Sequence, residues 1–310
     1  MYEPLPRTVM VGNMPDHRSR EILPAAVFAS LCFVWGSTWL AIKVGLSSLP
    51  PLTFAGLRFL VASGILLVYA MARRVELPAD RFSWKIMSFL SITQIVLAFA
   101  LAFWGEQYLT AGLTALLFAT LPFFVAALAH FVIPGERLTV WKMAGMLVSF
   151  LGVTIIFWRE LVITGNSFWG GLAVIASAAS AGCANVVGKK YSETINPTIN
   201  VVVQIGIGAV ILSMAGITVE RGLPITLNLE SIFAILYLAV AGSAFGFVAL
   251  YWLFTKMEVT KTSLFTFITP IVAVLLGWLF LGEKVDLNVA LGGALILAGV
   301  ILVNRSPMAG

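Results

Sequence analysis

The sequence contains one pattern twice, and this duplication constrains the fold more than any other feature. The two copies are residues 114–157 and 262–303, and in each a threonine precedes a proline by eight positions. A Gly-Glu pair and two spaced glycines follow each proline. From the Gly-Glu pair onward the copies lie 147 positions apart, and upstream of it 148. Such a repeat indicates a fold built from two related units.

The composition places most of the chain in lipid. Hydrophobic residues make up 60% of the sequence and charged residues 11%, with a mean hydropathy of +1.00. Soluble domains carry about a quarter charged residues. A core of 310 residues cannot hide this much apolar surface from water, so the sequence predicts an integral membrane protein with the lipid bilayer as a partner.

Ten apolar segments are each long enough to cross a bilayer as a helix. They are residues 24–45, 52–72, 86–106, 111–133, 139–158, 168–189, 198–219, 231–255, 262–281 and 287–304. Proline and glycine mark the short joints between them, so neighbouring helices are expected to be antiparallel. The predicted fold class is an all-α integral membrane protein with ten transmembrane helices, preceded by a disordered cytoplasmic tail at 1–23.

The basic residues predict the orientation. Fourteen of the 19 Lys and Arg residues fall at one side of the predicted spans and four at the other, while Arg58 lies within a span. Because Lys and Arg accumulate on the cytoplasmic side, both termini are expected in the cytoplasm of a multi-pass protein of the cytoplasmic (inner) membrane.

Each repeat has an odd number of spans, so the second enters the membrane inverted. We expect a first five-helix repeat at 24–158 and an inverted second one at 168–304. Inverted repeats are the plan of secondary transporters, whose site lies near the midplane between the halves. The alternative is a duplication retained for packing only.

Several motifs carry a family resemblance. The sequence reads Trp-Gly-Ser at 35–37, Lys43, Leu-Arg-Phe at 57–59, and then the two prolines and the two Gly-Glu pairs. In this order they resemble the EamA-like family of the drug/metabolite transporter superfamily, over residues 24–304. The resemblance implies a ten-helix exporter of small metabolites, often amino acids. The second half departs from the first, because Ala-Gly-Cys stands at 181–183 and Gln204 replaces Arg58.

The expected function is therefore export of small organic metabolites, with amino acids as the expected small-molecule substrates, by alternating access. One alternative is a phosphorylated-sugar or nucleotide-sugar carrier of the same superfamily, which would need several inward Lys or Arg residues for phosphate. A remote alternative is an intramembrane enzyme, which would need an acid–base pair, a nucleophile beside a histidine, or a metal cluster at membrane depth. The sequence shows none of these, so we expect no catalytic residues.

Metal, cofactor and nucleic-acid functions are disfavoured. Two histidines are too few for a multi-histidine metal site, so no metal and no cofactor are expected. Although the net charge is +5, basic residues do not gather with aromatics on a hydrophilic face, so no nucleic-acid partner is expected.

Pro122 and Pro270 lie near the centres of the fourth and ninth predicted spans. A mid-helix proline frees the carbonyl four residues earlier, here those of Phe118 and Thr266. Freed carbonyls at membrane depth need a partner or a wet cavity. We expect the two prolines to form gating bends beside the pathway, the alternative being static kinks.

Arg58 is the costliest residue to bury. It lies about 10 Å into the second span at 1.5 Å per residue, and an arginine near the bilayer centre costs at least ~3 kcal/mol. Lys43 and Glu106 fall in the same half of the membrane, so the three side chains are expected to cluster as an outer gate. Alternatively, Arg58 binds a substrate carboxylate through its bidentate fork, and Lys43 and Glu106 reach the interface.

Three amides lie within apolar segments: Gln94, Asn185 and Gln204. Such amides bind a polar ligand or hydrogen-bond between helices. Aromatic residues beside the duplicated motifs are expected to line an apolar cavity, the alternative being a belt at the membrane interface. They are Trp39, Trp104, Tyr251 and Trp252.

The last span of each repeat carries glycines expected to serve helix packing, or a dimer face in a possible homodimer. They are Gly145, Gly152, Gly292, Gly293 and Gly299. Glu136 and Glu283 follow turn glycines, and each is expected to stabilise the start of the helix that follows it.

Overall fold

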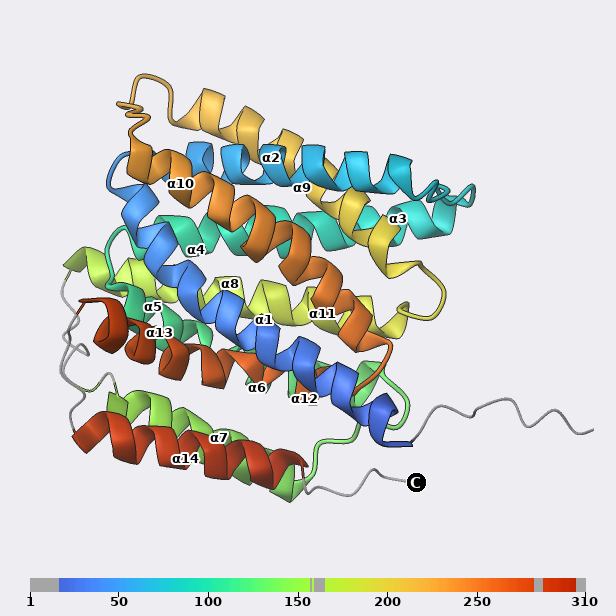
Figure 1. Ribbon diagram of the computed structural model, residues 1–310, viewed down its shortest axis with the longest axis vertical. Helices are drawn as coiled ribbons and strands as arrows, with labels where there is room; N and C mark the ends of the chain where they lie inside the picture. Colours follow the sequence, from blue (N-terminus) through green and yellow to red (C-terminus); the bar gives the residue numbers. More distant parts are fainter. Residues whose placement is uncertain (1–16, 157, 159–164, 282–286, 305–310) are drawn as a thin grey trace, which may run out of the picture.

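The computed structural model describes residues 17–156, 158, 165–281 and 287–304, and within these ranges it is a helical bundle without strands (Figure 1). The first repeat contains α1 (His17–Leu46), α2 (Pro51–Ala72), α3 (Arg81–Leu90), the π-helix η1 (Ser91–Leu97), α4 (Ala98–Glu106), α5 (Ala111–Phe118), α6 (Leu121–Val132) and α7 (Val140–Ile156). The second contains α8 (Gly165–Lys190), α9 (Pro197–Val219), α10 (Leu229–Tyr237), the π-helix η3 (Leu238–Phe245), α11 (Gly246–Phe254), α12 (Val259–Ser263), α13 (Phe265–Leu281) and α14 (Leu287–Asn304).

These elements form ten rods, which confirms the predicted fold class. Seven described helical stretches are long and apolar enough to cross a membrane, and three shorter apolar helices, at 140–156, 259–272 and 290–303, complete the set. Two of the seven contain a π-helix in the middle, because α3, η1 and α4 form one rod and α10, η3 and α11 another. The rods match the ten predicted spans in order.

The two repeats are related by inversion. Two pairs of equivalent helices, α2 with α9 and α7 with α14, pack against each other in antiparallel directions, and glycines allow the close approach. A Cβ added to Gly145 would lie 2.6 Å from the Gly299 carbonyl oxygen, and one added to Gly152 would lie 2.9 Å from the amide nitrogen of Ile296. As numbers rise along α7 they fall along α14. The predicted glycine packing is thus within the chain, and a homodimer remains a prediction.

The helix pair α7 and α14 lies at one edge of the bundle, beyond α5, α6 and α13 (Figure 1). The main core is formed by the other helices. Large apolar side chains remain exposed on the outside, such as Val68 and Met71 on α2 and Phe131 on α6. Lipid is the solvent that suits such a surface.

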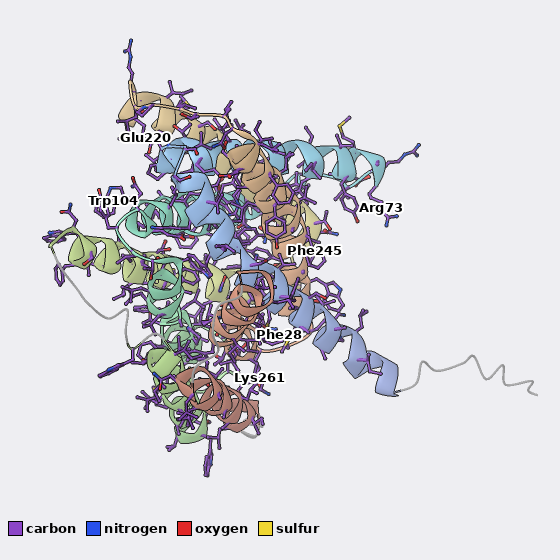
Figure 2. The ribbon with its side chains drawn as sticks, turned by 60° about the vertical axis from the view of Figure 1, so that its left-hand side comes forward. Phe28, Arg73, Trp104, Glu220, Phe245 and Lys261 are labelled. Carbon is purple, nitrogen blue, oxygen red and sulfur yellow. The ribbon has the colours of Figure 1, made fainter. Side chains whose placement is uncertain are left out.

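The bundle has two distinct ends. Figure 2 shows Trp104 and Glu220 at one end and Arg73 at the other, and we call these the Trp104 end and the Arg73 end. In Figure 1, α1 begins and α14 ends at the same end of the bundle, as an even number of crossings requires. The helix α1 begins at His17, inside the segment expected to be a tail, and residues 1–16 lie outside the described residues.

Candidate functional site

A cavity lies in the core between the two repeats. Its volume is about 70 Å³, and its lining comes from α1, α2, η1, α4, α5, α6, α8, α11 and α13. Four of the eight predicted substrate-binding residues line it: Trp39, Arg58, Gln94 and Asn185. A volume of this size holds a few water molecules, since one needs about 10–15 Å³.

Arg58 is the charged group of this cavity. Its side chain is 2% exposed, and its Nε donates to Ser243 Oγ at 2.8 Å. The guanidinium carbon lies 4.8 Å from the Phe99 ring centroid and 5.1 Å from that of Phe59. Cation–π contact stabilises the charge without using its N–H groups. Nη1 has no hydrogen-bond partner among the described residues.

Two amide oxygens of the lining also lack partners. Gln94 is 6% exposed and Asn185 2%, and neither Gln94 Oε1 nor Asn185 Oδ1 accepts a hydrogen bond from a described residue. Leaving a buried acceptor unpaired costs about 1–3 kcal/mol. Three unsatisfied polar groups in the lining of one cavity are the arrangement expected of a site that a polar ligand completes.

The rest of the lining is mostly aromatic. Trp35 meets Phe265 edge to face at 4.5 Å between ring centroids, and Trp39 meets Phe118 at 5.4 Å. The cavity is therefore an apolar enclosure with a few convergent polar groups, as small-molecule sites commonly are.

Both π-helices adjoin the cavity. η1 supplies Gln94, and η3 supplies the Ser243 hydroxyl that holds Arg58. Their irregular backbones are held from other helices, because Ser180 Oγ donates to the Thr93 carbonyl and Trp35 Nε1 to the Gly242 carbonyl, at 2.8 and 2.9 Å. π-Bulges inside α-helices occur frequently at functional sites. The sequence alone does not predict these π-helices.

Gln204 and Tyr251 lie outside the cavity lining. Gln204 Nε2 donates to Asn200 Oδ1 at 2.8 Å, and the Tyr251 hydroxyl donates to Gln204 Oε1 at 3.1 Å. Gln204 and Tyr251 are 1% exposed. This network joins α9 to α11, which is the helix-joining alternative for Gln204.

Trp104 and Trp252 also lie outside the lining. Trp104 is 39% exposed and packs edge to face on Tyr108, at the end of the bundle shown in Figure 2. Lys256 Nζ lies 5.8 Å from the Trp252 ring centroid. These contacts are those of aromatics near a membrane interface.

Lys43 lies beside Glu106 as expected, but Arg58 does not join them, so the expected cluster of three does not form. No hydrogen bond or ion pair joins these three described side chains, because Lys43 Nζ donates to the main-chain oxygens of Glu106 and Leu109, at 3.0 and 2.6 Å. Carbonyls at a helix end lack intrahelical donors, so a lysine from a neighbouring helix satisfies them.

The same anchor occurs in the second repeat. Lys189 Nζ donates to the main-chain oxygens of Phe254 and Met257, at 2.5 and 3.1 Å. Lys43 and Lys189 are repeat-equivalent, 146 positions apart. Each therefore ties the first helix of its repeat to the end of the third rod, one at each end of the bundle.

The two prolines occupy different positions, and the expected symmetry is wrong in this respect. Pro122 is in the first turn of α6, after a break between α5 and α6, and is not mid-helix. Pro270 lies inside α13, and the carbonyl that it frees, that of Thr266, accepts from the Thr269 hydroxyl at 3.2 Å. Thr266 and Thr269 both line the cavity.

We expect Pro270→Ala to slow transport more than Pro122→Ala does. Alanine at 270 would restore an N–H that bonds the Thr266 carbonyl and stiffens α13 beside the cavity. At the start of α6 no intrahelical bond is missing, so alanine changes little. Initial flux in vesicles should fall roughly three- to tenfold for Pro270→Ala, a barrier change of about 0.7–1.4 kcal/mol. Equal slowing by the two variants would contradict this.

Contacts between the repeats join them at the Arg73 end. Glu136, in the turn before α7, accepts from the backbone N–H groups of Val259 and Thr260 at 2.9 and 3.3 Å. The expectation that Glu136 starts α7 is therefore wrong, since its carboxylate caps α12 of the other repeat. Beside it, Lys142 Nζ lies 2.7 Å from Glu258 Oε2. Glu283 lies outside the described residues.

The Glu258 contact predicts a pH dependence of stability. Burial raises the pKa of Glu258, but the hydrogen bonds and charges of Lys142 and Lys261 outweigh it and hold the pKa below its ordinary value. A lowered folded-state pKa gives stability that is present above the ordinary glutamate range and lost as pH falls through the folded value. The Tm difference between wild type and Glu258→Gln should therefore be largest near neutral pH and shrink on acidification. A constant difference would contradict this.

The sequence profile of the EamA-like transporter family matches residues 23–158 and again residues 168–305. The Bacillus subtilis proteins YoaV and YvbV, both named as uncharacterized transporters, are 28% and 30% identical to this chain. The alignments cover 88% and 92% of this chain and 94% and 92% of those proteins.

A third relative and a solved structure agree with these. The Escherichia coli protein YedA, named as an uncharacterized inner membrane transporter, is 28% identical over 93% of this chain and 92% of its own. A crystal structure superimposes with a TM-score of 0.76 over 91% of this chain and 96% of that chain, at 16% identity, and shows the shared fold. This multi-pass membrane protein, with its ten rods in two inverted repeats, belongs to the EamA-like transporter family.

Proposed function

We propose that the protein exports small organic metabolites, specifically amino acids, by alternating access across the cytoplasmic membrane. The observation that carries this proposal is the cavity between the repeats, where Arg58 Nη1 and the side-chain oxygens of Gln94 and Asn185 have no hydrogen-bond partners in the described parts of the chain. In this proposal the Arg73 end faces the cytoplasm with both termini, and the Trp104 end faces outward. The inner-membrane description of YedA supports this location.

The three polar groups suit a zwitterion. A guanidinium binds a carboxylate through parallel N–H donors, and amide oxygens accept from an ammonium group. The aromatic walls suit an apolar body and tolerate a cation. An amino acid would therefore satisfy the three groups of the lining that have no partner among the described residues.

Phosphorylated substrates suit the cavity less well. Among the described lining residues, Arg58 is the one with a positive charge. A phosphate ester carries about two negative charges near pH 7, so its burial beside one arginine would leave charge uncompensated. This balance favours amino acids over sugar phosphates and nucleotide sugars.

Counterflow in proteoliposomes tests the proposal. Vesicles preloaded with a mixture of unlabelled amino acids should take up the labelled mixture, and protein-free vesicles should not. Competition separates the two charged groups: methyl esters lack the carboxylate and hydroxy acids lack the ammonium, so both should compete poorly. Inhibition by sugar phosphates but not by amino acids would overturn the proposed substrate class.

A further inference from the structure

In the part of the chain that the structure describes, three glutamates at helix ends and in turns are buried, and one of them differs from the others. Glu136 and Glu220 are 6% and 7% exposed, and Glu106 is 0% exposed. The carboxylate of Glu220 accepts from the N–H groups of Leu52 and Thr53, each at 2.8 Å, just as that of Glu136 caps α12. Among the described residues, neither carboxyl oxygen of Glu106 has a hydrogen-bond partner. Glu106 thus lacks the donors that a buried carboxylate requires.

The contacts of the neighbouring Lys43 do not explain why a carboxyl group is present at position 106. Lys43 Nζ is directed to main-chain oxygens, and the equivalent Lys189 makes the same anchor where Phe254 stands in the place of Glu106. The second repeat shows that this anchor forms without a carboxyl group. The Glu106 side chain therefore needs another explanation.

Among the described residues, Lys43 is the charged group that acts on Glu106. α1 contributes Lys43, and α2 contributes Arg58, whose guanidinium lies 5.9 Å from the Phe103 ring on the cavity side. α8 approaches the preceding residue, Gly105, through uncharged Gly170 and Val174. The turn after α4 contributes Tyr108, which packs on Trp104. An ionised carboxylate here would be buried without a hydrogen bond, whereas a protonated one carries no charge to compensate.

The position of Glu106 is between the cavity and the Trp104 end. It is the last residue of α4, and Ala102, one turn earlier, lines the cavity. Ile42, next to Lys43, lines it too. Opening the Trp104 end to release a substrate would separate Lys43 from the end of α4 and admit water to this carboxyl group.

We propose that Glu106 is a proton-binding site linked to the outer gate, a step that rests on the transport function proposed above. The carboxyl group holds a proton while the Trp104 end is closed, releases it to external water when that end opens, and takes one back on closing. No other bond changes. Because proton binding favours the closed state, a low external pH holds the gate closed.

Infrared spectroscopy of the full-length protein in vesicles tests the protonation directly, without a substrate. A C=O band of a protonated carboxyl group should be present near neutral pH in wild type and absent in Glu106→Gln. It should persist in the matched control Glu136→Gln, where the buried carboxylate has its donors. If Glu106→Gln does not fold, Glu106→Asp should shift the band. A wild-type spectrum without a Glu106-dependent band would overturn the proposal.

Counterflow of the labelled amino-acid mixture then tests the link to the gate. Wild-type exchange should rise with external pH, and Glu106→Gln should stay at the low-pH rate throughout. An unchanged pH profile in Glu106→Gln would overturn the link. If wild type transports none of the amino acids while the band is present, the proposed substrate class fails and the proton site stands.

Discussion

Arg58→Ala is expected to reduce amino-acid counterflow by roughly 10- to 100-fold, which corresponds to the loss of a charge-assisted hydrogen bond of about 1.5–3 kcal/mol. Its Nη1 is the unpaired donor in the cavity, and no described lining residue can replace the charge. Arg58→Lys keeps the charge but loses the planar fork and the stacking on Phe99, so it should recover only part of the rate. Initial rates at several substrate concentrations measure both variants.

Two comparisons keep this result interpretable. Lys43→Ala removes an anchor to main-chain oxygens outside the cavity lining, so it should impair transport less than Arg58→Ala. Thermal unfolding of each purified variant separates a folding defect from a transport defect. Equal losses in the two alanine variants, with equal Tm values, would contradict the assignment of Arg58 to the substrate.

The number and order of the helices could be predicted because a bilayer imposes a minimum length on each apolar segment. The inversion followed from an odd number of spans in each repeat. The burial of three polar residues inside the bundle could be predicted for a related reason, namely Arg58, Gln94 and Asn185. A polar side chain at membrane depth is costly unless it faces protein or water, so the sequence predicts each of them inside the bundle.

The contacts of the site could not be predicted in the same way. Gln204 is equivalent to Arg58 and accepts a hydrogen bond from the Tyr251 hydroxyl. Arg58 has no such partner, because the residue equivalent to Tyr251 in the first repeat is Phe103, which offers no hydroxyl. A sequence indicates that an amide side chain is buried, but it does not indicate which group becomes its hydrogen-bond partner. The cavity is consequently asymmetric although the helices are symmetric.

Backbone irregularities account for the other differences. The π-helices at 91–97 and 238–245 begin and end without proline, so no proline in the sequence indicates them. Pro122 did indicate an irregularity, but the helix ends before this proline and α6 begins next to it. A proline fixes where a helix hydrogen bond is missing, and the surrounding packing decides between a kink and a new helix.

Adjacent glycines on α14 give the largest predicted effect on stability. A Cβ on Gly292 would lie 2.5 Å from the Gly152 carbonyl oxygen, whereas one on Gly293 would meet nothing within 4 Å. Gly292→Leu should therefore destabilise the protein by about 3 kcal/mol or more, since backbone cannot move aside as a side chain can. Gly293→Leu changes helix propensity in the same way and should stay within about 1 kcal/mol of wild type. Thermal unfolding in one detergent compares them.

This pair also separates stability from transport. No residue of α7 or α14 lines the cavity among the described residues. Gly292→Leu protein that folds should then bind substrate with an unchanged KM while its Tm falls, and Arg58→Ala should show the reverse. A raised KM in folded Gly292→Leu would mean that the α7–α14 pair moves with the cavity helices during transport. Similar Tm values for the two leucine variants would contradict the close packing of α7 on α14.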